Sequence, residues 1–174
     1  MKGPLTKFLA GDHARLDALL RRAVANPALV DRSAYEEFRA GLLRHIAMEE
    51  KVLLPDARRR RGGDPLPVAR QLRADHAALA SLLVPTPTSA IVDTIRGILD
   101  SHNQLEEGPD GLYAICEQLA GSEVEDLAAR AQAVPEVPVA PHFDGPRVHE
   151  HIANLLNART NTVLPIGRGT RHRP

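Results

Sequence analysis

The sequence predicts an all-α protein: an up-down four-helix bundle followed by a C-terminal helical appendage. Aromatic residues make up only 3% of the 174 residues and Trp is absent. A core of this chain must therefore be built from Leu, Ala, Val and Ile, which favours helices over a β-sandwich. Apolar residues recur at helical spacing in four long segments joined by short loops, which is typical of such a bundle. We place the bundle in residues 1–121 and the appendage in residues 122–174.

The first two bundle helices have clear boundaries in the sequence. The first is expected to begin at Pro4, which suits a first helical turn, and to end before the Asn-Pro pair at residues 26–27. The second is expected to begin at Ser33, where Glu36 completes a capping box. It ends in the basic run at residues 58–61, since basic residues suit a helix C-terminus.

The third helix is expected over residues 67–84, and the fourth from about residue 91 to residue 105. Pro109 removes a helix hydrogen bond, so we expect a kink there before the helix resumes as far as Leu119. In the appendage, Ser122 and Glu125 form a second capping box that predicts a short helix to about residue 133. A Pro-rich extended segment, a last helix over residues 147–159 and a disordered basic tail complete the chain.

Composition excludes several classes of protein. Lys plus Arg and Asp plus Glu both number 22, and this balance argues against a nucleic-acid or membrane-surface binder. The only cysteine, Cys116, excludes an intrachain disulfide and any Cys-rich zinc or iron–sulfur site. No apolar run reaches the ~20 residues of a membrane span, and the N-terminus has no long apolar signal-peptide region. We therefore expect a cytoplasmic protein.

Two helices carry a histidine and a glutamate on their buried faces. In the second helix, His45 and Glu49 continue the apolar seam formed by Phe38 and Leu42, at alternating spacings of four and three residues. His102 and Glu106 occupy the same positions on the seam of the fourth helix. His-x-x-x-Glu-Glu is improbable by chance, yet it occurs twice, as HIAMEE and HNQLEE. Both pairs are therefore expected to point into the core.

The first and third helices each add one histidine on the apolar seam. A helix with one seam histidine followed by a helix with His-x-x-x-Glu therefore occurs twice along the chain. Core histidines satisfied by hydrogen bonds are the alternative interpretation. Buried carboxylates are costly unless protons or metal ions compensate them. Imidazole with carboxylate suits iron, manganese or zinc, and the lack of thiolate disfavours structural zinc. Six such side chains are many for one ion and suit two ions bridged by carboxylates. The candidate ligands are His13, His45, Glu49, His76, His102 and Glu106.

The motifs resemble the hemerythrin-like HHE cation-binding family. The matching segments are GDH at residues 11–13, HIAMEEKVLLP at 45–55, ADH at 74–76 and HNQLEE at 102–107. The resemblance covers roughly residues 5–120. It implies a hemerythrin-like bundle that holds two non-haem iron ions, bridged by the two motif glutamates and by an oxo or hydroxo oxygen.

The chain departs from the oxygen-carrying members of this family at Leu72, which stands where those carriers have a fifth histidine. One iron should therefore have fewer nitrogen ligands. The open position favours azide, nitric oxide or peroxide, and oxidation of the centre over reversible oxygenation. Glu50 and Glu107 are expected to be helix-surface charges, with Glu107 kept as a weaker ligand candidate because some family members carry an acidic residue there.

Several residues outside the motifs have simpler interpretations. His142, His149 and His151 are expected on the solvated surface; the alternative is that one of them replaces the missing ligand. We expect removal of residues 136–174 to leave the metal centre unchanged. Tyr113 is interpreted as an aromatic residue at the end of the bundle; the alternative is that it forms a hydrogen bond near the metal site. Cys116 is interpreted as a small buried hydrophobe.

Three functions are compatible with these features. The first is a di-iron protein that binds or reacts with oxygen, nitric oxide or peroxide as a carrier, sensor or oxidase. The second is an iron-donating or stress-repair protein, and the third is a metal-stabilised interaction module whose appendage recognises a protein partner. No Gly-x-Ser-x-Gly, P-loop or His-Glu-x-x-His motif is present. We therefore expect a metal- and small-ligand-binding protein more than a dedicated enzyme, and we assign no catalytic residue.

Overall fold

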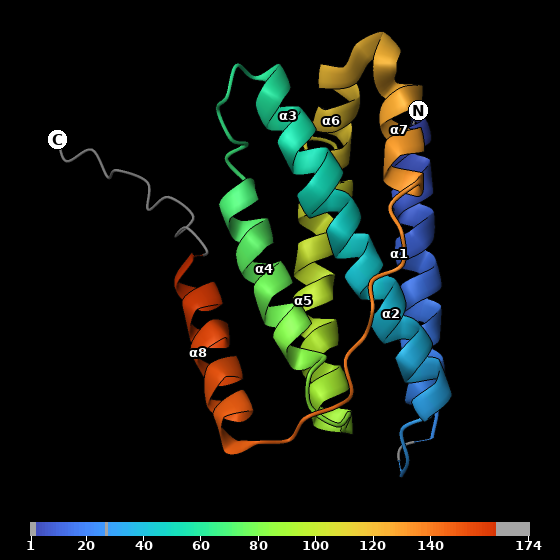
Figure 1. Ribbon diagram of the computed structural model, residues 1–174, viewed down its shortest axis with the longest axis vertical. Helices are drawn as coiled ribbons and strands as arrows, with labels where there is room; N and C mark the ends of the chain where they lie inside the picture. Colours follow the sequence, from blue (N-terminus) through green and yellow to red (C-terminus); the bar gives the residue numbers. More distant parts are fainter. Residues whose placement is uncertain (1–2, 27, 163–174) are drawn as a thin grey trace, which may run out of the picture.

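The computed structural model describes residues 3–26 and 28–162, and these residues form helices and connections with no strand. This confirms the all-α bundle with an extra C-terminal helix (Figure 1). Pro27 and the basic tail from residue 163 lie outside the described residues. The helices that line the bundle interior are α1 Pro4–Ala23, α2 Arg32–Met48, α4 Ala69–Leu82 and α5 Ser89–Glu107.

The predicted second helix is a continuous rod of three parts. α2 passes into a π-helical turn, η1 Glu49–Leu53, and then into α3 Leu54–Arg60. The helix begins one residue earlier than predicted, because the Asp31 carboxylate accepts a hydrogen bond of 3.1 Å from the Ala34 amide. The capping box expected at Ser33 is therefore replaced by an Asp cap.

The fourth helix is interrupted where Pro109 predicts a break. α5 ends at residue 107, and α6 Leu112–Ala120 begins after a tight turn. Gly111 is needed in this turn, since a Cβ there would lie 2.6 Å from the carbonyl oxygen of Glu106. The close approach lets α6 continue beside the end of the bundle and return Tyr113 toward the interior.

α7 Val124–Gln132 follows a 3₁₀ turn, η2 Gly121–Glu123, and packs against α1 (Figure 1). The expected capping box at Ser122 does not form, because α7 has no side-chain cap. Leu127 and Ala131 are buried in the same cluster as Leu5 and Leu9 of α1. Residues after 121 thus share the hydrophobic core of the bundle, and a division of the chain at this residue remains a prediction.

α8 Pro146–Thr162 packs along α4, after an extended segment that runs back along the bundle (Figure 1). The segment is fixed at its far end, where the Phe143 amide donates to the Val84 carbonyl at 3.0 Å. None of the helices in the described residues combines the length and apolar character that crossing a bilayer needs.

The core consists of two apolar clusters separated by a polar layer. In α1, Leu5 and Leu9 belong to one cluster, and Leu16 and Leu20 belong to the other. His13 lies between these pairs and is itself buried. The same division occurs on the other bundle helices, so the histidines and glutamates form a layer in the middle of the bundle.

Candidate metal centre

The structure brings all six sequence-predicted ligands together. Each of the four bundle helices contributes one buried histidine to the polar layer. Glu49 and Glu106, the two motif glutamates, have no exposed surface at all. Each lies one helical turn after a histidine of its own helix, so His-x-x-x-Glu spacing places both donors on one face.

The donors fall into two overlapping groups, in each of which one atom per residue lies within 4.8 Å of all the others. We call the first group site A and the second group site B. Site A contains His13, His45, Glu49 and Glu106, and site B contains His76, His102, Glu49 and Glu106.

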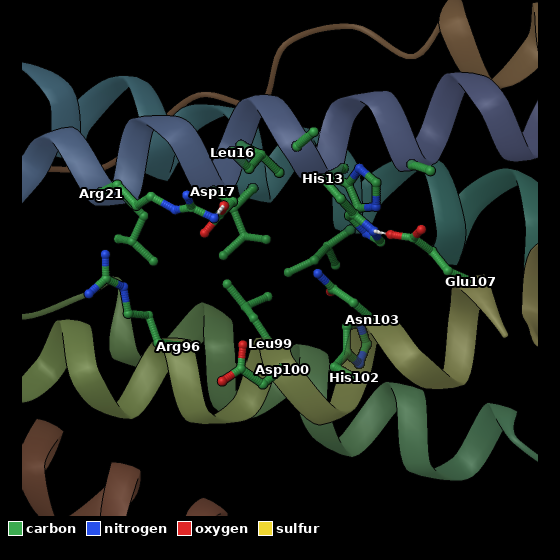
Figure 2. Close-up of a pocket in the computed structure, with 16 residues that line it drawn as sticks. His13, Leu16, Asp17, Arg21, Arg96, Leu99, Asp100, His102, Asn103 and Glu107 are labelled. Atoms are coloured by element: carbon green, nitrogen blue, oxygen red, sulfur yellow. Dashed lines mark hydrogen bonds and ion pairs between the residues drawn. The ribbon is translucent and has the colours of Figure 1, made fainter.

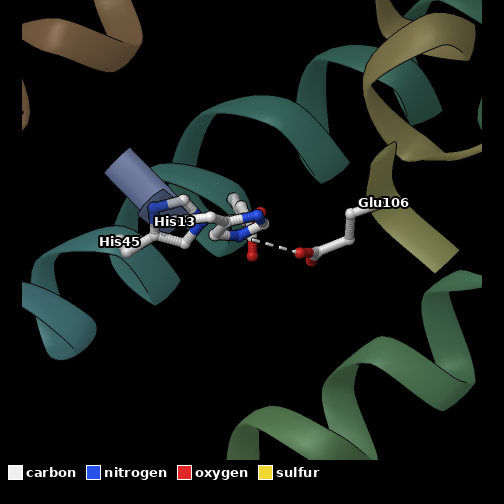
Figure 3. Close-up of side chains that lie close together, drawn as sticks. His13, His45 and Glu106 are labelled. Atoms are coloured by element: carbon white, nitrogen blue, oxygen red, sulfur yellow. Dashed lines mark ion pairs between the residues drawn. The ribbon is translucent and has the colours of Figure 1, made fainter. Parts of the chain in front are cut away.

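Each glutamate gives one oxygen to each site. In site A, Nε2 of His13 lies 3.3 Å from Oε2 of Glu106 (Figure 3). In the same site, Nε2 of His45 lies 3.2 Å from Oε1 of Glu49. In site B, Nε2 of His76 lies 3.0 Å from Oε2 of Glu49, and Nε2 of His102 lies 3.0 Å from Oε1 of Glu106. The two carboxylates therefore span both sites.

A second set of carboxylates holds the imidazoles from behind. Their oxygens contact Nδ1 of the histidines, which leaves Nε2 of each ring facing the centre. Metal-binding histidines are usually oriented in this way, because the outer partner fixes the tautomer and the ring. The pairs are Glu107 with His13 at 2.8 Å, Asp12 with His45 at 2.8 Å, Glu50 with His76 at 2.8 Å and Asp75 with His102 at 3.2 Å.

Glu50 and Glu107 therefore differ from the surface charges that the sequence suggested. Both are partly exposed, but each has an oxygen on a buried imidazole. The π-helical turn explains the position of Glu50, because its wider helical turn lets Glu49 and Glu50 contact opposite nitrogens of His76. Helical periodicity gives no signal for this, although the doubled Glu in both motifs was visible in the sequence.

The electrostatics of the layer favour positive charge. Burial alone lowers the pKa of His45, but the Glu49 carboxylate and the contact with Asp12 outweigh it and raise the pKa to about 10. Burial is likewise outweighed at His76, where the Glu106 and Glu49 carboxylates raise the pKa to about 11. The carboxylates thus stabilise cationic charge among them, which protons or metal ions can supply.

Three buried polar atoms in site B have no hydrogen-bond partner among the described residues: Oε2 of Glu49, Oε1 of Glu106 and Nε2 of His76. A buried polar atom without a partner costs about 1–3 kcal/mol. Nε2 of His76 lies 3.0 Å from Oε2 of Glu49 and 3.9 Å from Oε1 of Glu106, and all three are donor atoms that divalent or trivalent metal ions accept. The residues present therefore fit a bound metal cation.

The Tyr113 hydroxyl lies in the layer, which differs from the bundle-end position expected for this residue. It donates to Oε1 of Glu49 at 2.7 Å and lies 3.1 Å from Nε2 of His13. It is also 3.2 Å from both Nε2 of His45 and Oε2 of Glu106. From the sequence alone, a hydrogen bond near the site is only the alternative for Tyr113, because this residue follows the break after α5, where helical register no longer predicts direction.

A cavity of about 390 Å³ leads from the surface to the layer between α1, α2 and α5. His13, His45 and His102 line its inner end, and Asn103 points into it between α1 and α5 (Figure 2). Asp17, Arg21, Arg96 and Asp100 lie toward its other end (Figure 2). The centre is thus reachable by molecules larger than water.

The C-terminal histidines within residues 28–162 do not reach the layer. His142 contacts Glu36 at 2.5 Å at the far end of the bundle, and His149 and His151 are exposed on α8. α8 nevertheless contacts the centre indirectly, since Nε of Arg159 donates to Oδ1 of Asp75 at 2.6 Å. Asp75 in turn contacts His102, so α8 is linked to the layer through one carboxylate. That removal of residues 136–174 leaves the metal centre unchanged stays a prediction.

The fold and the layer define a helical-bundle protein with a buried site for cations. The model of the hemerythrin HHE cation binding domain matches residues 5–108, and the chain belongs to this family of cation-binding proteins. Searches of curated proteins and of solved structures find no significant match to the chain.

Proposed function

We propose that this protein binds two non-haem iron ions, one in site A and one in site B, with Glu49 and Glu106 as bridging ligands. The division of each carboxylate between two histidine pairs carries this proposal. A single ion would need only one oxygen of each glutamate and would leave one histidine pair unused. Imidazole and carboxylate donors without thiolate suit iron, and di-iron sites with this donor set occur in helical bundles.

We further propose that the centre binds or reacts with a small ligand such as oxygen, nitric oxide or peroxide. A bound iron pair supplies Lewis-acid and redox chemistry toward such molecules. The cavity beside His13 and His102 supports this role, because it offers a route for a small molecule to the layer. Leu72 is buried one turn before His76 and contributes no donor atom. Site B therefore has fewer nitrogen donors than an oxygen carrier provides.

The protein's own side chains would position such a ligand. Asn103 lines the cavity, and its amide oxygen is buried without a hydrogen-bond partner among the described residues. Leu16, Leu42 and Leu99 line the same cavity, so part of its wall is apolar.

Anaerobic loading with Fe(II), followed by metal analysis and optical spectroscopy, tests the proposal. We expect two irons per chain, near-ultraviolet absorption from an oxygen-bridged pair after exposure to air, and spectral changes on addition of azide or nitric oxide. His142→Ala is the matched control, since this histidine contacts Glu36 and no donor of either site. A folded chain that takes up no iron would contradict the proposal, as would a His45→Ala variant that keeps both ions.

The same material tests how the centre responds to oxygen. We expect lasting oxidation, because the chain lacks the fifth histidine of the oxygen carriers at Leu72. A stable oxygenated form that survives repeated removal of oxygen would show reversible carriage instead. Bound iron that responds to none of these ligands would favour the interpretation as a metal-stabilised interaction module.

A further inference from the structure

Tyr113 is a second kind of oxygen donor at the centre, from outside the residues that match the family. It belongs to α6, beyond residue 108, and is fully buried. Its hydroxyl is surrounded by one donor atom of each residue of site A, at 2.7 Å from Glu49, 3.1 Å from His13, and 3.2 Å from His45 and Glu106. No donor histidine of site B has such a contact with it among the described hydrogen bonds.

These distances have a simple meaning in coordination chemistry. Metal–nitrogen and metal–oxygen bonds are about 2.1 Å long, so neighbouring ligands of an octahedral ion lie about 3.0 Å apart. The hydroxyl oxygen of Tyr113 lies 2.7–3.2 Å from four donor atoms. An atom at the position of the ion itself would lie about 2.1 Å from each donor. The hydroxyl therefore has the spacing of a fifth ligand beside the other four.

We infer that Tyr113 is a protein ligand of the metal ion in site A and binds it through the phenolate oxygen. This inference rests on the proposed binding of iron. On binding, the O–H bond of the phenol breaks, a bond from oxygen to the ion forms, and the proton is released to solvent; no electron is transferred. A direct hydrogen bond to Glu49 is thereby exchanged for a bond to the ion that Glu49 also binds.

The turn between α5 and α6 is built to hold the ring in this position. Gly111 packs against the Glu106 carbonyl where no side chain would fit. The residues on either side of Tyr113 on the buried face, Leu112 and Cys116, lie in the apolar cluster next to the layer. The ring therefore enters from the end of the bundle, opposite to the cluster that contains Leu16 and Leu20.

As a consequence, the two proposed ions would differ in their protein ligands. Site A gains a hard anionic oxygen donor, which stabilises the ferric state. Site B has Leu72 one turn before His76 and gains no fifth protein ligand. An external ligand such as azide is therefore expected to bind at site B and to leave the phenolate in place.

The test uses the full chain, loaded with iron and oxidised. A phenolate bound to ferric iron gives a charge-transfer band in the visible, and excitation in this band enhances tyrosine ring vibrations in the resonance Raman spectrum. The chain has only two tyrosines. Tyr35, the matched control, is buried in the other apolar cluster, and its hydroxyl has no hydrogen-bond partner in the part of the chain that the structure describes. We expect the band in the wild type and in Tyr35→Phe, and its complete loss in Tyr113→Phe.

The outcomes separate this inference from the proposal on which it rests. A wild-type chain with two irons and no phenolate vibrations overturns the inference alone. A folded chain that binds no iron overturns both. If Tyr113→Phe does not fold, ring-deuterated tyrosine in the wild type decides, since phenolate modes must shift on labelling and must persist in Tyr35→Phe.

Discussion

The outer carboxylates should tune the two sites separately. Glu107 contacts His13, which belongs to site A only, and Glu50 contacts His76, which belongs to site B only. Glu107→Ala removes the acceptor for Nδ1 of His13 and frees the ring to change tautomer and orientation. We therefore expect this variant to weaken iron binding at site A, and Glu50→Ala to weaken it at site B.

The expected loss of iron affinity in these variants depends on how exposed the two carboxylates are. Loss of an outer partner of a metal-binding histidine lowers metal affinity by about 10–100-fold, which corresponds to about 1.4–2.7 kcal/mol. The Glu107 and Glu50 side chains are 29% and 28% exposed. Water can therefore replace part of the lost hydrogen bond, and we expect an effect near tenfold in both variants.

Anaerobic titration with Fe(II) in matched backgrounds measures the effect. In a His13→Ala background, Glu107→Ala should cause no further loss of affinity, because its partner is already absent. In a His76→Ala background, the same change should cost its full tenfold. Equal losses in the two backgrounds would show that Glu107 acts through the overall charge of the layer, and the assignment of separate partners would be wrong.

Three further predictions follow from the contacts of single residues. Glu106→Gln should lower the iron content of both sites, measured by metal analysis, whereas Glu107→Gln should retain most of it; the reverse order would show that Glu106 is not the bridging residue. Arg159→Met should weaken binding at site B by less than tenfold in an Fe(II) titration, because it acts only through Asp75, and an unchanged affinity would exclude a role for α8. Asp56→Asn should destabilise the fold at neutral pH by about 1–2 kcal/mol in urea unfolding. Burial by itself raises the pKa of Asp56, but hydrogen bonds from three arginines outweigh it and lower the pKa from 3.8 to about 2. A full shift would be worth about 2.4 kcal/mol, which solvent screening of Arg59 and Arg130, 65% and 44% exposed, reduces. The stabilisation is complete above pH 3.8 and is lost as the pH falls through 2, so a difference between Asp56→Asn and wild type that stays constant down to pH 2 would contradict this account.

The inward positions of the six ligands could be predicted because they follow from helical geometry alone. His45 and Glu49 are four residues apart on an apolar seam, and a seam in a bundle must face the other helices. The break after α5 was equally predictable, since Pro109 lacks the amide hydrogen that a helix needs. Such predictions need only local spacing and the fact that apolar faces are buried.

The outer contacts of the site needed information that spacing does not hold. The π-helical turn over Glu49–Leu53 shifts backbone hydrogen bonding by one residue, as from the Leu54 amide to the Glu49 carbonyl. Pro55 marks a disturbed helix next to this turn, but helical spacing does not predict which side chains the wider turn brings to His76. Tyr113 reaches site A only because the turn at Gly111 sets the direction of α6. Arg159 reaches Asp75 across an extended segment, where no periodicity relates the two residues. Each of these contacts depends on how separate elements are placed in space.

The doubled motifs now have a physical explanation. Neighbouring residues on a helix point about 100° apart, so an Asp-His or Glu-Glu pair at a helix interface faces two different helices. In α1, His13 faces the middle of the layer while Asp12 contacts His45 of α2, and in α5, Glu106 faces the middle of the layer while Glu107 contacts His13 of α1. Each helix thus supplies a candidate ligand and also contacts a candidate ligand of another helix. This layer lies between the two apolar clusters and contains residues of all four bundle helices. Removal of bound metal ions would leave its buried carboxylates without compensating charge. We therefore expect metal removal to loosen the bundle as a whole and not one helix at a time.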